Sequence, residues 1–240
     1  MKILILVPIW QRPEITKIWA YSMGYFLTEG ISVLTILSRE DPYYHENLDI
    51  IHHSGFEVCY FENKPLGRKL NAGIEYALEA YDFDYLMNLG SDDILHPGLL
   101  SLYDPYIKAK NLFFGLDKVY FFDYIKHKLG LTEAYLWGAG RMISREILEK
   151  IRIKGSFLYE SKYERGLDCN SIENIKKLLN IDYLQVKTED FPYLVDIKSE
   201  FGINDFILMN KMYSLVDDEV LRLNFPKSVI KMLYGRKHTD

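Results

Sequence analysis

Two adjacent carboxylates, Asp92 and Asp93, follow an apolar segment and a turn of small residues in the stretch DYLMNLGSDDIL. The segment Tyr85–Leu89 has the composition of a buried strand. In α/β sheets, ligands bind beyond the carboxyl ends of the strands. Carboxylate oxygens are hard ligands that suit Mg²⁺ or Mn²⁺, so the pair indicates a metal site for a diphosphate. The alternative is a surface turn that caps a helix beginning near Pro97.

Strands and helices alternate through the first half of the chain, and this alternation predicts a mostly parallel central sheet flanked by helices. The expected strands are Lys2–Pro8, Ile31–Leu37, 56–62 and Tyr85–Leu89. Helices are expected at 13–27 and 44–54, and a loop followed by a third helix is expected within 65–81. The class is therefore α/β. Apolar residues at helical spacing, among them Ile15, Ile18 and Trp19, should face the sheet.

The second half is less regular. Its expected strands are Lys118–Tyr124, Ala134–Trp137 and Asp182–Lys187, its expected helices are 143–151 and 166–179, and an amphipathic helical tail follows from Asp217. No linker or repeat divides the chain. We therefore expect one domain over residues 1–240, with an alternating half at 1–95, a mixed half at 96–215 and a tail at 216–240.

The composition excludes several classes of protein. The formal net charge of -5 argues against broad nucleic-acid binding, which needs a basic face. The two cysteines, Cys59 and Cys169, are far apart and predict a reduced, cytoplasmic protein without a disulfide framework. The apolar run at the start is short and lacks a cleavage site, and nothing approaches the length of a membrane span. The basic segment Lys227–Lys237 allows weak peripheral contact with a membrane, although a packed terminal helix is favoured.

A series of motifs gives the chain a resemblance to nucleotide-sugar-dependent glycosyltransferases of the A-type fold, close to the large family 2. The motifs run from about residue 1 to 180 and read VPIWQRPE, SRED, KPLGRKLNAGIEYA, LGSDDILHPGLL, WGAGRMISREIL and RGLD. The resemblance implies a nucleotide-sugar-binding half at 1–95 and an acceptor half at 96–215. It also implies transfer of a sugar from a nucleoside-diphosphate donor to the hydroxyl of a saccharide or another acceptor.

In that family, the acids after the fourth strand hold a divalent metal against the donor diphosphate. Here Gly90 stands at the first acidic position, so the resemblance assigns the metal to Asp92 and a supporting or sugar-contacting role to Asp93, with Ser91 in the donor site. One carboxylate holds Mn²⁺ or Mg²⁺ less firmly than two do. Metal-independent activity, or no activity, therefore stays open.

The resemblance places further residues beside the donor. Pro8 and Arg12 follow the first strand next to the nucleotide, and either Glu40 or Asp41 accepts hydrogen bonds from the base or ribose unless SRED is a solvated turn.

Arg68 and Lys69 are expected to contact the diphosphate. The alternative is surface charge at a helix start, but a helix N-terminus favours anions over cations. An anionic ligand therefore explains these two residues slightly better. Asn71 is expected to fix the loop.

The catalytic step that the resemblance implies is an inverting transfer, which needs a carboxylate to accept the proton of the acceptor hydroxyl. Asp168 in the RGLD motif is the expected base, and Glu164 is the reserve. The alternative for Asp168 is a helix N-cap. Gly138 and Gly140 would let a sugar approach the backbone closely, or would form a tight turn.

Other functions remain to be compared with this one. A nucleotidyltransferase should carry a glycine-rich loop after the first strand, where this chain reads PIWQRPE. A processive membrane synthase lacks support, because the chain has neither the spans nor a Gln-x-x-Arg-Trp motif. A non-catalytic sugar-nucleotide or glycan-binding module, derived from a transferase, stays open because of Gly90.

Overall fold

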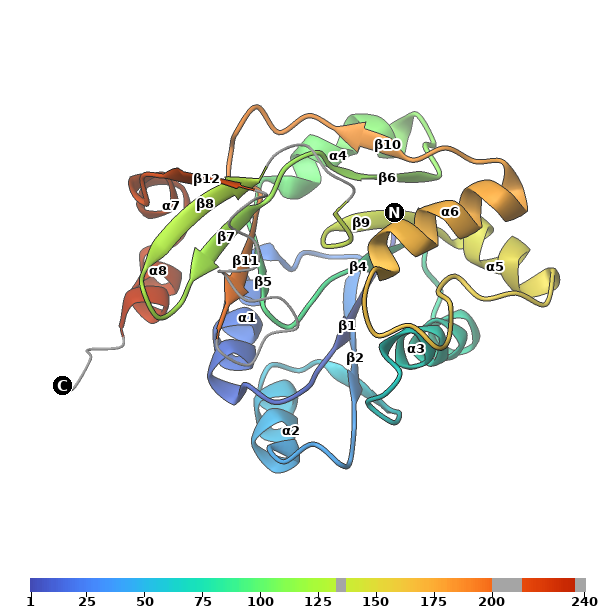
Figure 1. Ribbon diagram of the computed structural model, residues 1–240, viewed down its shortest axis with the longest axis horizontal. Coiled ribbons are helices and arrows are strands. Elements are labelled where there is room, and N and C mark those ends of the chain that lie inside the picture. Colours follow the sequence, from blue (N-terminus) through green and yellow to red (C-terminus); the bar gives the residue numbers. More distant parts are fainter. Residues whose placement is uncertain (133–136, 200–212, 236–240) are drawn as a thin grey trace.

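The structure, a computed structural model, describes residues 1–132, 137–199 and 213–235 (Figure 1). The helices are α1 (Pro13–Phe26), α2 (Tyr44–His53), α3 (Leu66–Ala80), α4 (Leu99–Lys108), α5 (Arg145–Ile153), α6 (Leu167–Leu179), α7 (Glu219–Asn224) and α8 (Lys227–Tyr234). The strands are β1 (Ile3–Pro8), β2 (Ile31–Leu37), β3 (Glu57–Tyr60), β4 (Tyr85–Asn88), β5 (Asp93–Leu95), β6 (Phe113–Leu116), β7 (Tyr120–Asp123), β8 (Lys128–Thr132), β9 (Arg141–Ser144), β10 (Leu184–Val186), β11 (Leu194–Lys198) and β12 (Tyr213–Val216). None of the helices within these residues is long and apolar enough to cross a membrane.

The main sheet has seven strands in the order β10-β6-β9-β4-β1-β2-β3. Strand β1 runs parallel to β2 and β4, and β3 runs parallel to β2. Alternate residues of a strand point to opposite faces. Accordingly, Ile5 of β1 packs in a core with α1, α2 and α4, whereas Leu6 packs in a second core with α3, α5 and α6. The predicted α/β architecture, with helices on both faces of a mostly parallel sheet, is confirmed.

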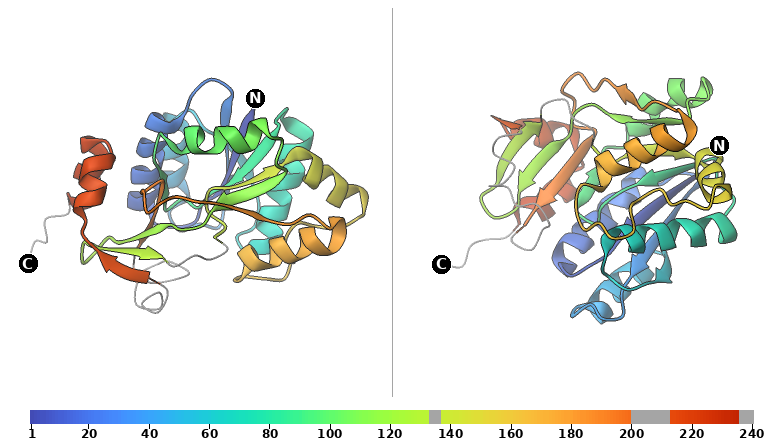
Figure 2. Two further views of the ribbon diagram at one scale, coloured as in Figure 1. Left: turned by 90° about the horizontal axis from the view of Figure 1, so that it is seen from above. Right: turned by 45° about the vertical axis from the view of Figure 1, so that its right-hand side comes forward.

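A second sheet of five strands, in the order β12-β8-β7-β11-β5, lies beside the main sheet (Figures 1 and 2). Its apolar face packs against α1, α7 and α8 in a third core, to which Ile18, Phe122, Val195 and Leu221 contribute. Helix α1 therefore contacts both sheets and fixes one relative to the other.

Most expected elements of the first half match within about two residues, but several elements differ from what the sequence predicted. Residues Arg141–Ser144 form β9, so the expected helix over 143–151 begins later, at Arg145. Four residues are too few to show a strand period, and β9 is buried between β4 and β6, antiparallel to both. Asp93–Leu95, to which the sequence assigned no element, is strand β5. The tail forms two helices, because Pro226 separates α7 from α8.

The strand expected at Ala134–Trp137 falls largely outside the described residues, and Trp137 itself is not in a strand. The expected strand Lys118–Tyr124 is shorter than predicted, at Tyr120–Asp123.

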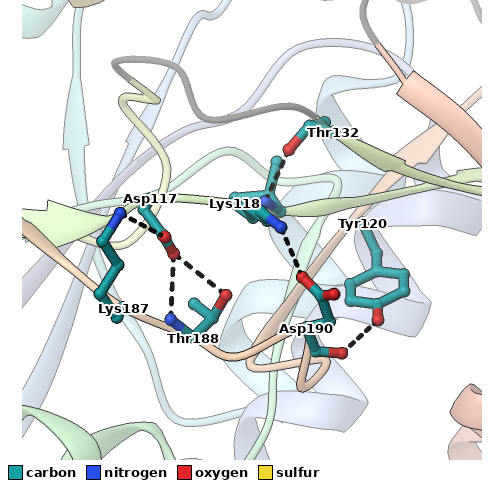
Figure 3. Close-up of polar contacts among 8 residues, drawn as sticks. Asp117, Lys118, Tyr120, Thr132, Lys187, Thr188 and Asp190 are labelled. Carbon is teal, nitrogen blue, oxygen red and sulfur yellow. Dashed lines mark hydrogen bonds and ion pairs between the residues drawn. The ribbon is translucent and has the colours of Figure 1, made fainter.

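Two of the crossings from the main sheet into the second sheet, between β6 and β7 and between β10 and β11, run side by side, because β10 pairs in parallel with β6 and β11 pairs in parallel with β7. Polar contacts join the two crossings (Figure 3). The buried carboxylate of Asp117 accepts hydrogen bonds from the backbone N–H and the Oγ1 of Thr188, each at 3.0 Å. Lys118 Nζ lies 2.6 Å from Asp190 Oδ1, and the hydroxyl of Tyr120 donates to the carbonyl of Asp190. These contacts set the direction in which β11 enters the second sheet.

Removing the Asp117 carboxylate should weaken this junction. We expect Asp117→Ala to lower the free energy of unfolding by about 2 kcal/mol, because the buried N–H of Thr188 loses its acceptor. Urea unfolding measures the change. The control is Asp104→Ala, which breaks an exposed pair with Lys108 on α4 and should cost less than about 0.5 kcal/mol. An equal loss of unfolding free energy in the two variants would contradict a stabilising role of Asp117 at this junction.

Candidate functional site

A cavity of about 490 Å³ opens beyond the carboxyl ends of β1 and β4, where the second sheet meets the main sheet. Most of the residues assigned from the sequence line it: Pro8, Arg12, Lys69, Ser91, Asp92, Asp93, Glu164 and Asp168. The cavity is not lined by Glu40, Asp41, Arg68 or Asn71. Its position is the one at which open α/β sheets bind their ligands.

Three carboxylates meet at one wall of the cavity, since ligand oxygens of Asp92, Asp93 and Asp196 lie within 4.8 Å of one another. Asp196 comes from β11, where it stands in register with Asp93 of the antiparallel strand β5. Burial, with the charges of Asp196 and Asp92, raises the pKa of Asp93 well above its usual value. Burial also raises the pKa of Asp196 to about 6. The like charges are therefore crowded in a poorly solvated place.

Two cations, the half-buried Arg12 and the buried Lys198, offset part of this charge. Arg12 Nη1 lies 2.7 Å from Asp92 Oδ2, and the ammonium of Lys198 pairs with Asp196. Burial alone would raise the pKa of Asp92, but Arg12 and Lys198 outweigh it and hold this pKa below its usual value. The cluster contains three carboxyl groups and two cations, so one further positive charge is needed to neutralise three ionised carboxylates.

The triad could hold a divalent metal ion. Carboxylate oxygens are the ligands that Mg²⁺ and Mn²⁺ prefer. Asp196 Oδ1 is buried and has no hydrogen-bond partner within residues 1–132, 137–199 and 213–235, so it is free to bind an ion. The residues therefore fit the metal that the resemblance implies, with Asp196 as an additional acid.

Gly90 explains how this triad differs from the two-acid motif of the family. A Cβ atom at residue 90 would lie 2.5 Å from Asp92 Oδ1 and 2.8 Å from Asp93 Oδ2. The backbone N–H of Gly90 also donates to Asp93 Oδ2 at 2.6 Å. The two acids thus occupy the space that a side chain at residue 90 would need, and an acid there would require them to move.

Asp196 was not assigned to the site from the sequence, and Lys198 was considered there only as part of a late loop over the diphosphate, whereas it lies on a strand. In the strand LVDIK they alternate with Val195 and Ile197, which face the third core. The sequence did contain a sign of their role, because Asp196 and Lys198 place two opposite charges on one face of a short apolar strand. Strands rarely bury charges that lack a partner or a function.

Arg12 reaches Asp92 from an unusual turn. Gln11 and Arg12 both have left-handed backbones, with φ of 54° and 51°. Such a conformation costs a residue other than glycine about 1–2 kcal/mol. Asp41 stabilises the turn, because its Oδ2 accepts a hydrogen bond from the N–H of Gln11 at 2.8 Å. Asn47 Nδ2 donates to the carbonyl of Gln11 at 3.2 Å and to Asp41 Oδ2 at 3.1 Å. The buried carboxylate of Asp41 is therefore engaged with the protein rather than directed at the cavity.

Lys69 is fully buried, and its ammonium donates to the carbonyl of Ile9 at 2.7 Å and to Asn63 Oδ1 at 3.1 Å. Burial lowers its pKa to about 8. Arg68, by contrast, is exposed and lies 3.5 Å from Glu62. The structure thus directs Lys69 to the loops that follow β1 and β3, and Arg68 toward solvent.

The remaining two assignments beside the cavity are also engaged locally. Glu40 Oε1 accepts a hydrogen bond from the N–H of Asn63 at 2.8 Å. Asn71 Nδ2 donates to the carbonyl of Tyr159 at 2.8 Å, and Asn71 Oδ1 accepts from the N–H of Tyr159 at 3.1 Å. Asn71 therefore fixes the segment between α5 and α6.

Asp168 lies in the first turn of α6 and faces Gly138 across the cavity wall. A Cβ atom on Gly138 would come within 1.9 Å of Asp168 Oδ1, so any residue other than glycine at this position would displace the carboxylate. The N-cap of α6 is Gly166, which rules out the alternative of Asp168 as the cap. Arg141 holds both segments, because it donates to the carbonyls of Asp168 at 3.0 Å and Trp137 at 2.9 Å. Glu164 lies on the preceding loop and is exposed.

Comparisons with known proteins agree on the fold alone. No protein-family model and no curated protein matches the chain. Among solved structures, S. aureus TarS 1–349 in complex with UDP gives a TM-score of 0.59 at 12% identity, covering 97% of this chain and 64% of that one. Its complex with UDP-GlcNAc gives 0.58 at 14% identity, with 97% and 70% covered. A mycobacterial protein gives 0.56 at 12% identity, with 99% and 76% covered.

This chain spans 60% of the length of TarS 1–349 in a further structure of that fragment. The likeness confirms the glycosyltransferase A-type fold that the sequence motifs predicted.

The turn at Gln11 and Arg12 gives a test of Asp41. We expect Asp41→Ala to lower the free energy of unfolding by about 2–3 kcal/mol, because the N–H of Gln11, the N–H of Tyr43 and the amide of Asn47 lose their acceptor. Thermal or urea unfolding measures it, and Glu46→Ala on the exposed side of α2 should change stability by less than about 0.5 kcal/mol. Unchanged stability together with lost nucleotide affinity would instead mean that Asp41 contacts a ligand, as the sequence suggested.

Proposed function

We propose that this protein transfers a sugar from a nucleoside-diphosphate sugar to the hydroxyl of an acceptor. The observation that carries the proposal is one cavity with two kinds of acidic group: a charge cluster of Asp92, Asp93 and Asp196 with two cations, and a separate carboxylate, Asp168. The first suits a diphosphate and the second suits proton transfer. The UDP and UDP-GlcNAc complexes of TarS support a nucleotide-sugar donor in this fold.

The donor diphosphate is proposed to bind against the charge cluster. Arg12 offers a planar guanidinium that can form two parallel hydrogen bonds to phosphate oxygens, and Lys198 offers a compact positive charge from β11. Asp92, with Asp93 and Asp196, would hold Mg²⁺ or Mn²⁺, which when bound would offset the negative charge that develops on the leaving diphosphate. Since Asp196 and Lys198 belong to β11, the donor site also draws on the half at 96–215.

Asp168 is the proposed base. Its carboxylate packs against Gly138, where a side chain would displace it, and both residues line the cavity in which an acceptor would bind. As the hydroxyl oxygen attacks the anomeric carbon, Asp168 accepts its proton, and the bond to the diphosphate breaks. Inversion at the anomeric carbon is the expected outcome of this single displacement. Glu164 is the reserve base on the neighbouring loop.

The second candidate is a non-catalytic module that binds a sugar nucleotide or a glycan. The ion pair between Arg12 and Asp92 favours it, because the pair occupies an oxygen of the acid to which the resemblance assigns the metal. Slow hydrolysis of a bound nucleotide sugar would distinguish an enzyme from such a module. For either function we propose a cytoplasmic protein, from its cysteine content.

Nucleotide binding tests the donor site. We expect UDP or GDP to bind in titration calorimetry, and Mn²⁺ to strengthen the binding at least about tenfold through the acidic triad. The strengthening should grow as the pH rises through about 6, where Asp196 loses the proton that competes with the metal. Asp92→Asn should abolish it. Binding without any effect of Mn²⁺ would leave the diphosphate to Arg12 and Lys198, and no binding of either nucleotide would refute the proposed function.

The base is tested by hydrolysis of a nucleotide sugar, in which water replaces the acceptor. We expect Asp168→Asn to slow turnover by about 10²–10⁴-fold, while the affinity for the free nucleoside diphosphate changes less than about twofold. Glu164→Gln is the matched control and should leave turnover within about threefold of the wild type. The reverse result would make Glu164 the base.

A further inference from the structure

Asn88 is a polar residue at the last position of β4, and it lines the cavity between the groups already described. Its Nδ2 donates a hydrogen bond to the hydroxyl of Tyr159 at 2.7 Å. Its Oδ1 is buried and has no hydrogen-bond partner in the part of the chain that the structure describes. Leaving such an acceptor unpaired costs about 1–3 kcal/mol, so this atom is suited to a hydrogen bond from a ligand.

Tyr159 holds the amide of Asn88 in place. The tyrosine is itself almost fully buried, and its backbone is fixed by both ends of the Asn71 amide. Because a tyrosine hydroxyl can donate or accept, a rotated Asn88 amide would still bind it and would leave Nδ2 unpaired instead. In either orientation one polar atom of this cavity-lining residue has no partner among the described residues.

The position of Asn88 suggests what that ligand group is. Two residues further along lies Gly90, against which Asp92 and Asp93 pack. On the other side, the carbonyl of Asn88 accepts the N–H of Gly140 at 2.8 Å, which places it beside the turn that Asp168 faces. Asn88 is therefore located between the proposed diphosphate site and the proposed base. In a transfer reaction the donor sugar occupies this place.

We propose that Asn88 recognises a hydroxyl of the donor sugar, and that Tyr159 and Asn71 are positioning residues for it. This inference rests on the proposed function. A sugar hydroxyl both donates and accepts, so it matches the free atom of the amide in either orientation. Asn88 thus determines which sugar is accepted, whereas Arg12 and Lys198 bind the diphosphate that all donors share.

The test compares a sugar nucleotide with the free nucleotide on the same variant. UDP, GDP, UDP-GlcNAc, UDP-glucose and GDP-mannose are titrated into the wild type, and the sugar nucleotide that binds most tightly is kept. We expect Asn88→Ala to weaken the binding of that sugar nucleotide about tenfold and to change the affinity for its free nucleoside diphosphate less than about twofold. The ratio of the first affinity to the second therefore falls. Tyr159→Phe should lower this ratio in part, because it releases the amide of Asn88 without opening the core.

Asn174→Ala is the matched control, since Asn174 binds the carbonyl of Leu158 next to Tyr159 but does not line the cavity. It should leave the ratio unchanged. If Asn88→Ala does not fold, the ratio measured on Tyr159→Phe decides the question. An unchanged ratio, or an equal loss for the free nucleotide, would overturn the role of Asn88 and leave the transferase intact. Failure of the wild type to bind any nucleotide would instead refute the proposed function, and this inference with it.

Discussion

The site depends on a buried cluster of charges that no single segment of the chain can satisfy. Arg12 follows β1, Asp92 and Asp93 follow β4, and Asp196 and Lys198 lie on β11. A buried charge is tolerated only where opposite charges and hydrogen bonds compensate for lost solvation. Each of the three segments therefore needs the other two, and the cavity forms where they meet.

The junction between the two sheets is what brings β11 to this place. Both crossings, from β6 to β7 and from β10 to β11, are joined through Asp117, Thr188 and Asp190 (Figure 3). On the opposite side of the cluster, Asp41 and Asn47 stabilise the left-handed turn that directs Arg12 inward. These residues do not touch the cavity, yet they determine the geometry of the residues that do.

Local sequence patterns predicted much of the fold and identified some of the residues that line the cavity. The alternation of apolar strands and amphipathic helices predicted the parallel core of the main sheet, and Asp92, Asp93 and Asp168 were assigned from their places after a strand and before a helix. Strand β9 was missed because its four residues, RMIS, include only two apolar side chains and are too few to show a period. Asp41 and Asn71 were placed beside the donor, but their hydrogen bonds support backbone segments that are distant in sequence.

The sequence by itself thus determined the α/β class, the polarity of the strands in the first half and the edge of the sheet at which the candidate site lies, because these follow from short-range periodicity. Only the tertiary structure decided that Asp196 completes an acidic triad, that Lys198 and Arg12 offset part of its charge, and that Asn88, which lines the cavity, keeps an unpaired amide atom. These pairings join residues from β1 to β11. They depend on how a second sheet is seated against the first, and no local pattern encodes that relation.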